Sequence, residues 1–207
     1  HMAEADAYAG EEILDGMEAK VKELGIDVRT GTKGFDLIVD ESGKVTGVKV
    51  QNKNNTYDIN AKAVIIATGG FCNNKDLLAE YAPGYEVFNT SNQMGTTGDF
   101  VKVFEKNGFK LEHMDNVRLF PNIIVPRRDL TGGADLSLLV NKEGARFISE
   151  NAGGLELGNS IQAQPDGAVF SITDKTGYDS FYRIRKHVGL GYYSQGETLA
   201  ELAEALG

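Results

Sequence analysis

The segment that decides the fold is Ala61–Phe71, with the sequence AKAVIIATGGF. Its apolar and β-branched residues stop abruptly at Thr68-Gly69-Gly70. A short apolar run of this kind is typical of a central strand buried on both faces, and we expect such a strand over Ala63–Ala67. Glycines at its end allow a bulky ligand to approach the main chain, although a plain strand-to-loop turn has the same composition.

The residues that precede this segment predict a helix and a small antiparallel sheet. Residues 3–24 carry apolar side chains at helical spacing, so this helix is expected to pack on a sheet through one apolar stripe and to end at Gly25. The turn residues Glu41–Lys44 favour antiparallel pairing of their neighbours. Strands are expected at residues 26–29, 35–40, 45–51 and 56–59.

The residues that follow predict a polar loop between two helices. Helices are expected at residues 75–81 and 100–107, and the loop Asn89–Asp99 (NTSNQMGTTGD) leads into the second one. Asp99 is expected to be the N-cap of that helix. Backbone N–H groups at a helix start favour anions or hydroxyl groups, so the loop is a candidate ligand contact. The alternative is that Asp99 only caps its helix.

The second half of the chain predicts a mixed α+β region. Pro121 and Pro126 restrict the strands near them to edges or extended segments. Thr198 and Glu201 form a capping box at the start of the last helix. Strands are expected at residues 118–120, 123–125, 136–140, 146–149 and 168–172, and helices at residues 180–186 and 199–206.

The composition excludes several classes of function. The 207-residue chain has a formal charge of −9, whereas a nucleic-acid-binding surface needs clustered Lys and Arg. Its single cysteine, Cys72, excludes an internal disulfide, and no His/Cys/carboxylate spacing predicts a metal site. No apolar stretch approaches the roughly 20 residues of a membrane span. The location stays open: a cytoplasmic one is favoured, and an exported or membrane-associated parent protein is the alternative.

Several segments together resemble the FAD-dependent fumarate reductase and succinate dehydrogenase flavoprotein family. In the family's order they are DESGKVTGVKV, AKAVIIATGGF, TTGDF, NGFKLEHMDNVRLFP and LLVNKEGARFISE. The resemblance implies a mixed α/β and α+β fold. Residues 3–121 would be a glutathione-reductase-type FAD-binding domain without its dinucleotide-binding start. Residues 122–207 would be an α+β capping domain that covers the substrate, and whether this cap is complete stays open.

The resemblance also implies FAD contacts at five residues. The main chain at Gly34 would lie by the adenine, Thr68, Gly69 and Gly70 would pass the dinucleotide, and Asp99 would lie near the FAD. No G-x-G-x-x-G pattern occurs in the chain, and the family's closing substrate-binding segment is missing as well. We therefore expect an internal fragment that binds FAD poorly by itself, while the full-length protein carries FAD.

The chemistry that the resemblance implies is hydride transfer between the flavin and an activated C–C bond, with an arginine as proton donor. The family's substrate-binding histidine falls on Phe120 in this chain. Its threonine–glutamate pair falls near Asp129-Leu130, the arginine after that pair near Gly133, and its proton-donating arginine on Gly154. None of these residues is chemically equivalent to the one that it replaces.

Other residues are candidates for the missing groups. Arg127 and Arg128 are the nearby candidates for a catalytic cation, and their alternative is a solvated surface pair. Tyr192 and Tyr193 would supply phenols to a carbonyl substrate, as tyrosines do in related ketosteroid dehydrogenases. His113 is expected to be a partly buried polar residue.

These observations favour a fragment of a fumarate-reductase-like flavoprotein oxidoreductase that acts on an unsaturated acid or an enone other than plain fumarate. Its electron donor stays open. The alternatives are a 3-ketosteroid-dehydrogenase-like flavoenzyme and a non-catalytic binding module on the same scaffold. Phe120 and the lost arginines favour a less charged pocket than a dicarboxylate needs.

Overall fold

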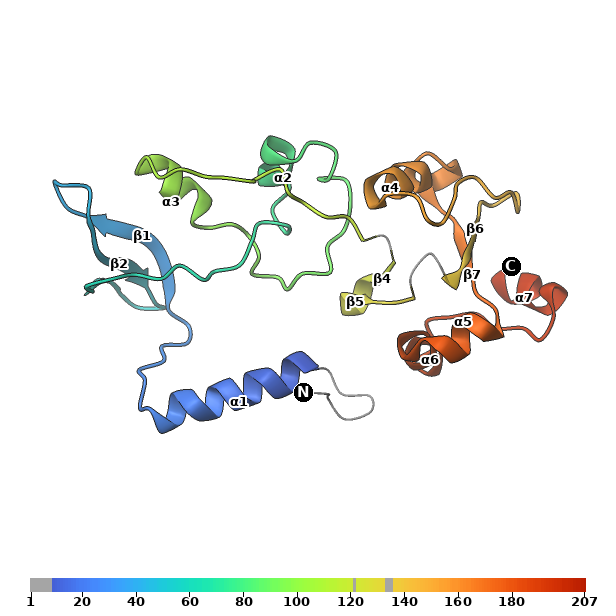
Figure 1. Cartoon of the computed structure of the whole chain (residues 1–207), viewed down its shortest axis with the longest axis horizontal. Helices are drawn as coiled ribbons and strands as arrows, with labels where there is room; N and C mark the ends of the chain where they lie inside the picture. Colours follow the sequence, from blue (N-terminus) through green and yellow to red (C-terminus); the bar gives the residue numbers. More distant parts are fainter. Residues whose placement is uncertain (1–8, 121, 133–135) are drawn as a thin grey trace. The chain divides into compact units, whose positions relative to one another are not determined.

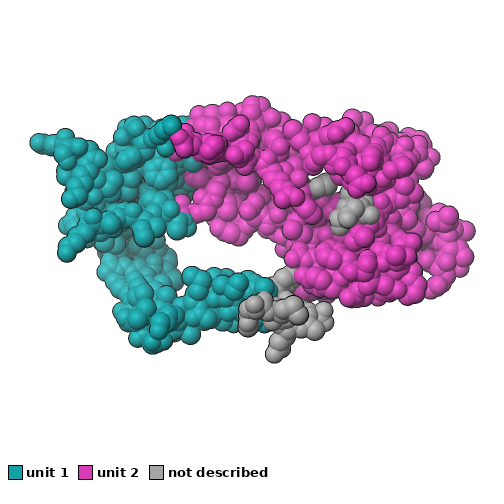
Figure 2. Space-filling model, in the orientation of Figure 1, with its two compact units in different colours: residues 1–67, 99–110 teal, residues 68–98, 111–207 magenta. Residues whose placement is uncertain are grey.

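The computed structural model describes residues 9–120, 122–132 and 136–207, and Figure 1 shows their helices and strands. The chain forms two compact units, which Figure 2 distinguishes by colour. Unit 1 comprises residues 1–67 and 99–110, and unit 2 comprises residues 68–98 and 111–207. Mixed helix and strand content, as predicted, characterises the chain.

Unit 1 is built on a three-stranded antiparallel sheet in the order β1-β2-β3. Its strands are β1 (Lys33–Val39), β2 (Val45–Gln51) and β3 (Thr56–Asn60). Leu37 pairs with Val48, which in turn pairs with Ile59. The Asp40 carboxylate stabilises the β1–β2 turn by accepting a hydrogen bond from the backbone N–H of Ser42 at 2.9 Å. The predicted meander is therefore confirmed.

The core of unit 1 combines this sheet with α3 (Val101–Lys106). Leu37, Phe100 and Val103 are buried in one apolar cluster. Val64 and Ile66, from the segment that follows the sheet, pack against the same cluster. Each apolar side chain of this size contributes about 1.5–3 kcal/mol when it is fully buried, so this cluster is a main source of stability for unit 1.

The predicted strand at Ala63–Ala67, buried on both faces, is wrong. The segment forms no strand, and Ile65 is 90% exposed. Among the described residues, the backbone of residues 61–67 makes one hydrogen bond, from Ala61 N–H to Thr46 O at 2.9 Å. A strand buried on both faces needs partners along both edges and apolar cover on both faces. The described residues cover the segment on one face only.

Helix α1 (Ala9–Glu23) confirms the predicted helix, but not its packing. Ile13, Leu14 and Met17, which form the apolar stripe, are exposed, and no described residue of the helix is buried. Helical spacing decides which side chains share a face, whereas burial needs an opposing surface. The strand expected at residues 26–29 is absent as well, so that prediction is wrong.

The predicted N-cap role of Asp99 is also wrong. Helix α3 begins at Val101, and Phe100 occupies its N-cap without a side-chain hydrogen bond. The Asp99 carboxylate lies 2.6 Å from the Lys33 ammonium nitrogen, at the start of β1. The late helix start moves Asp99 out of the N-cap position, and the ammonium group attracts its carboxylate instead.

Unit 2 consists of short helices and two two-stranded sheets. Strand β4 pairs with β5 and β6 pairs with β7, both antiparallel. Leu139, Leu157 and Ile184 are its most deeply buried apolar side chains. Its elements are α2 (Lys75–Tyr81), β4 (Ile123–Ile124), η1 (Val125–Arg127), β5 (Asp129–Leu130), β6 (Leu138–Val140), α4 (Gly154–Gln162), η3 (Pro165–Gly167), β7 (Phe170–Ile172), α5 (Lys175–Ser180), α6 (Tyr182–Gly189) and α7 (Leu199–Leu206).

The predicted helices of unit 2 are present, one of them with both boundaries shifted. Helix α2 has the predicted bounds, whereas the helix expected at residues 180–186 is found as α6, from Tyr182 to Gly189. Thr198 accepts a hydrogen bond from the backbone N–H of Glu201 at 3.2 Å, which confirms Thr198 as the N-cap of α7, while the Glu201 carboxylate accepts one from the backbone N–H of Glu197 at 2.8 Å. Local capping chemistry therefore predicted the start of α7 correctly.

The strand predictions for unit 2 are less accurate than the helix predictions. Residues 118–120 form no strand, so that prediction is wrong. The turn at residues 141–144 forms as expected, but the hairpin is reduced to one isolated bridge between Val140 and Arg146. The main partner of β6 is β7, which starts 30 residues later in the chain.

Two residues named in the sequence analysis, Pro121 and Gly133, lie outside the described residues. The boundary between residues 3–121 and 122–207 therefore stays a prediction. Within the described ranges, no helix combines the length and apolarity needed to cross a membrane. Within the same ranges, no three metal-ligating side chains come together.

Glu150 joins the turn that follows β6 to the strand itself. Its carboxylate accepts hydrogen bonds from the backbone N–H of Leu139 and from the Arg146 guanidinium, both at 3.1 Å. The guanidinium, followed by this backbone N–H, lowers the pKa of Glu150 from 4.5 to about 2. Because the charged form is favoured in the folded state, its contribution to stability is present above pH 4.5 and is lost as the pH falls toward 2.

We expect the Glu150→Gln variant to lower the free energy of unfolding by about 1–2 kcal/mol at pH 7, since a charge-assisted contact becomes a neutral one. The difference from the wild type should shrink at pH 3.5, because the wild-type carboxylate then begins to lose its advantage. Urea unfolding at both pH values, followed by circular dichroism, measures this. Glu143→Gln, at an exposed position of the same turn, is the control. An equal loss at both pH values would contradict the prediction.

Candidate functional site

The glycine turn at Thr68–Gly70 is hydrogen-bonded to the polar loop that precedes Asp99. The backbone N–H of Gly98 donates to the carbonyl of Gly70 at 3.1 Å. Asn73 adds a bond from its backbone N–H to Thr96 O at 3.0 Å. Asn74 adds another from its side-chain amide to Thr97 O at 2.9 Å. Residues 68–74 and residues 96–98 therefore form one surface within unit 2.

The two glycines of this turn leave its main chain open. Gly69 has φ = +77°, a conformation that costs other residues about 1–2 kcal/mol, and a Cβ at this position would lie 3.5 Å from Thr96 Cγ2. At Gly70, no atom lies within 4 Å of where a Cβ would be. Thr68, Gly69 and Gly70 are all exposed. A bulky group can therefore approach this backbone.

The other two predicted FAD contacts, Gly34 and Asp99, belong to unit 1. A Cβ at Gly34 would lie 3.5 Å from Val48 and 3.6 Å from the Phe100 ring, so β1 passes close to its neighbours here. The residue before Gly34, Lys33, binds the Asp99 carboxylate at 2.6 Å. The structure thus brings the start of β1 and Asp99 together, while Thr68, Gly69 and Gly70 belong to unit 2.

A pocket in unit 2 contains the position at which the family resemblance placed a substrate-binding histidine. Phe120 occupies that position and lines the pocket. Thr131 supplies a hydroxyl and Arg183 a guanidinium, and the other side chains of the lining are apolar or aromatic. The complete lining is Phe120, Leu130, Thr131, Leu136, Phe181, Tyr182 and Arg183.

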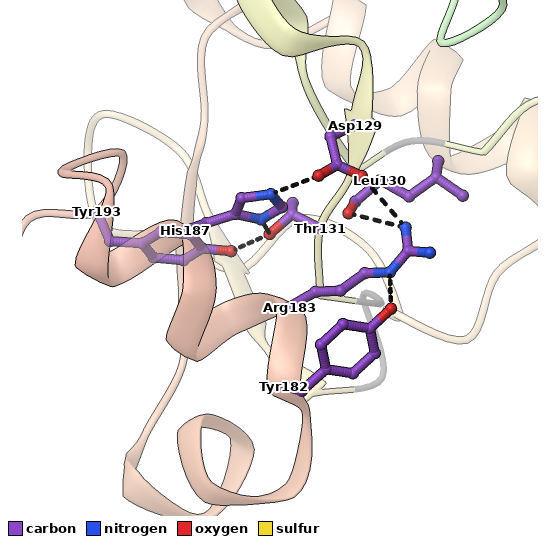
Figure 3. Close-up of polar contacts among 7 residues, drawn as sticks. All are labelled: Asp129, Leu130, Thr131, Tyr182, Arg183, His187 and Tyr193. Carbon is purple, nitrogen blue, oxygen red and sulfur yellow. Dashed lines mark hydrogen bonds and ion pairs between the residues drawn. The ribbon is translucent and has the colours of Figure 1, made fainter. Parts of the chain in front are cut away.

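A buried polar cluster lies behind Thr131, and Figure 3 shows its members. His187 is fully buried on α6. Its Nε2 lies 3.0 Å from the carboxylate of Asp129, and its Nδ1 lies 3.0 Å from the hydroxyl oxygen of Thr131. The Tyr193 hydroxyl lies 2.6 Å from the same Thr131 oxygen. Every polar atom of this histidine therefore has a partner, as a buried polar side chain requires.

Arg183 brings a positive charge to the pocket, but this charge is already compensated. Its Nη1 lies 3.4 Å from Asp129 Oδ1 and donates to the Leu130 carbonyl at 3.2 Å. Its Nε donates to the Tyr182 hydroxyl at 3.0 Å (Figure 3). An anionic substrate would have to compete with the Asp129 carboxylate for this guanidinium. The pocket therefore favours a neutral or weakly charged ligand over a dicarboxylate.

Gly154, the position of the family's proton-donating arginine, has no room for a side chain. A Cβ at Gly154 would lie 2.2 Å from the carbonyl oxygen of Leu119, at the first turn of α4. The backbone itself closes this position, so the proton donor of this chain, if it has one, is a different residue.

The two arginines predicted to replace the family's catalytic arginine do not line the pocket. Arg127 is exposed. The Arg128 guanidinium donates to the carbonyl of Asn92 at 2.8 Å and contacts Met94. Arg128 thus anchors the polar loop of unit 2. Neither residue belongs to the lining around Phe120, and a catalytic role for either of them stays a prediction.

Sequence reasoning missed the cluster around His187. A usable signal was the four-residue spacing of Arg183 and His187, which places both on one helix face. Asp129, the acidic partner of both, lies more than 50 residues away and gives no local signal.

The meander of unit 1 and the open glycine turn of unit 2 both lie in segments that carry the family resemblance. The family model "FAD binding domain" matches residues 1–178. The chain therefore belongs to this FAD-binding family, which contains fumarate reductase flavoproteins.

Curated relatives and solved structures agree with this assignment. A probable fumarate reductase of Shewanella frigidimarina is 31% identical over 211 residues, which cover all of this chain and 36% of that protein. A urocanate reductase of Eggerthella lenta is 32% identical over 88% of this chain and 32% of its own length. The chain thus spans about a third of the length of these relatives.

The solved structure of a flavocytochrome c3 fumarate reductase in its open conformation matches 99% of this chain and 37% of its own, with a TM-score of 0.86 and 31% identity. A 3-ketosteroid Δ1-dehydrogenase from Sterolibacterium denitrificans matches 92% of this chain and 39% of its own, with a TM-score of 0.66 and 23% identity. The similarity to the ketosteroid dehydrogenase shows a shared fold.

FAD is the cofactor of this family, and the described residues fit it. Gly69 and Gly70 present an open main chain, which a dinucleotide can approach closely. The Asp99 carboxylate is bound by Lys33 within unit 1, so its approach to FAD stays a prediction. When bound, FAD supplies hydride-transfer chemistry, and contacts from Gly34, Thr68, Gly69, Gly70 and Asp99 likewise stay predictions.

We expect the Gly69→Ala variant of the full-length protein to lose FAD. A Cβ at this position both strains the backbone and fills the space beside the exposed turn. Gly84→Ala is the matched control, because Gly84 also belongs to unit 2, has φ = +94° and has open surroundings. The ratio of flavin absorbance to protein measures retention. Equal flavin loss in both variants would assign the effect to backbone strain alone.

Proposed function

We propose that the full-length protein is an FAD-dependent oxidoreductase that transfers hydride between the flavin and a C–C bond next to a carbonyl or carboxylate. Family membership supports the cofactor and the reaction type. Within this proposal, residues 3–121 belong to a glutathione-reductase-type FAD-binding domain and residues 122–207 to a capping domain. The pocket around Phe120 is the substrate site.

The observation that carries this proposal is the chemistry of the pocket. Phe120, Phe181 and Tyr182 are aromatic, and the guanidinium of Arg183 is engaged by Asp129. Aromatic walls bind flat, apolar substrates well. The substrate is therefore an enone or an unsaturated acid with an apolar body, rather than plain fumarate.

A steroid-like enone is the second candidate substrate. The aromatic lining of the pocket favours it, and its single carbonyl oxygen needs only one or two hydrogen-bond donors. Thr131 and Tyr182 supply hydroxyl groups at the pocket wall. A non-catalytic binding module on the same scaffold is the alternative to either enzyme, and measured turnover separates these alternatives.

A substrate screen tests the proposal. The full-length protein is purified with its FAD, and the oxidation of a reduced viologen dye is followed with fumarate, urocanate, cinnamate and cyclohex-2-enone. We expect kcat/KM for fumarate to be at least about 100-fold lower than for the best acceptor, because two charge-assisted carboxylate contacts of about 1.5–3 kcal/mol each are missing.

The outcomes are distinct. Fumarate as the best acceptor would overturn the assignment of substrate. No turnover with any acceptor, in protein that binds FAD stoichiometrically, would favour the binding module. A protein without FAD would contradict the assignment of cofactor.

A further inference from the structure

The cluster behind the pocket forms a continuous chain of hydrogen bonds. It runs from Asp129 through His187 to Thr131 and on to Tyr193, with successive separations of 3.0, 3.0 and 2.6 Å (Figure 3). Asp129 and the fully buried His187 lie at one end, and the partly exposed Tyr193 is the other end. Thr131, in the middle, also lines the pocket. The chain therefore connects a buried titratable group to the candidate substrate site.

The chemistry of the partners decides which atom donates in each of these hydrogen bonds. The Asp129 carboxylate only accepts hydrogen bonds, so His187 Nε2 carries a hydrogen and donates it. In the neutral imidazole, Nδ1 is then an acceptor, and Thr131 must donate to it. In the imidazolium, Nδ1 donates to the Thr131 oxygen, so the Thr131 hydroxyl no longer donates to His187 and its hydrogen can bond to another acceptor. The protonation state of His187 therefore decides whether Thr131 has a hydrogen to give.

Charged groups and aromatic rings surround His187. Asp129 on β5 faces Nε2 with a negative charge, while Arg183 on α6 binds the other oxygen of the same carboxylate. Tyr192 packs its ring edge-on against the imidazole at 6.3 Å, and Tyr193 approaches through Thr131. The carboxylate thus lies between two groups that carry or accept positive charge.

The cluster is not needed to attach α6 to the β4–β5 hairpin. Ile184 on α6 is buried to 1% exposure and packs at Gly132, where a Cβ would lie 2.6 Å from Ile184 Cδ1. This apolar contact already joins the two elements. Buried polar networks are costly to assemble, and an apolar replacement is often as stable. The cluster is therefore not the sole attachment of α6 to this segment, which makes it a candidate for a functional role.

We propose that Thr131 delivers the proton of the reduction, and that His187 and Tyr193 act through it as positioning residues. The inference rests on the proposed function. It also accounts for the closed position at Gly154, where the family's arginine cannot be accommodated. Thr131 is the hydroxyl-bearing residue that both lines the pocket and contacts His187.

The step balances as follows. The π bond of the substrate C=C breaks, and one carbon receives a hydride with its two electrons from reduced FAD, which is thereby oxidised. The other carbon receives the hydroxyl proton of Thr131, and Thr131 takes the Nδ1 proton of the His187 imidazolium. His187 ends neutral, and Asp129 keeps its charge. A solvent proton returns to His187 through the Tyr193 and Thr131 hydroxyls.

The test compares Thr131→Val with Thr131→Ser in the full-length, FAD-loaded protein. Valine matches threonine in shape but removes the hydroxyl, whereas serine keeps it. Reduced enzyme is mixed without oxygen with the best acceptor of the screen, from fumarate, urocanate, cinnamate and cyclohex-2-enone, and flavin reoxidation is followed. We expect Thr131→Val to slow this half-reaction about 100- to 10,000-fold and Thr131→Ser to restore most of the rate.

Three further readouts separate proton delivery from a structural role. Flavin reduction by the dye and reoxidation by O₂ should be unchanged in Thr131→Val, because neither uses the pocket. The rate of acceptor reduction should fall in D₂O for the wild type. Tyr193→Phe should slow acceptor reduction, whereas Tyr178→Phe, which removes the hydroxyl of a half-buried tyrosine on α5 outside the cluster, should not.

Each result decides the inference. Unchanged acceptor reduction in Thr131→Val, with an active wild type, overturns it while the proposed function stands. A parallel loss of both half-reactions, or of FAD, in Thr131→Val but not in Thr131→Ser assigns the cluster a structural role and overturns the inference as well. A wild-type protein without turnover on any acceptor overturns both proposals.

Discussion

The Asp129 carboxylate accepts hydrogen bonds from Arg183 and His187, which lie one turn apart on α6. This shared contact determines the polarity of the pocket. It compensates the positive charge of Arg183, and it fixes the histidine tautomer that faces Thr131. An aspartate at this position therefore has two effects at once. It makes the pocket less suited to an anionic substrate, and it places a chain of transferable protons behind the pocket wall.

The surroundings of three glycines decide where other groups can approach the main chain of unit 2. Gly154 lies against the Leu119 carbonyl, Gly132 lies against Ile184, and Gly70 has open space beside its Cα. The first two glycines let unit 2 pack its helices tightly against extended chain, whereas the third leaves the main chain accessible. The same residue type thus closes one potential site and opens another, and only the surrounding atoms distinguish the two cases.

Local chemistry was predictable from sequence, and long-range contacts were not. The turn after Asp40 and the N-cap of α7 depend on residues a few positions apart, and both form. The exposure of Ile65 and the pairing of Asp99 with Lys33 depend on distant partners, so periodicity and capping rules failed there. The His187 cluster combines residues from β5, α6 and the segment after α6, and its members become neighbours only in the folded chain.

The closed position at Gly154 also has a consequence for redesign of the site. Placing an arginine there would bring its Cβ within 2.2 Å of the Leu119 carbonyl, so the backbone of residues 118–120 would have to move before the side chain could be accepted. A single Gly154→Arg substitution therefore cannot install a guanidinium at this position; a designer would have to rebuild the segment around Leu119 at the same time.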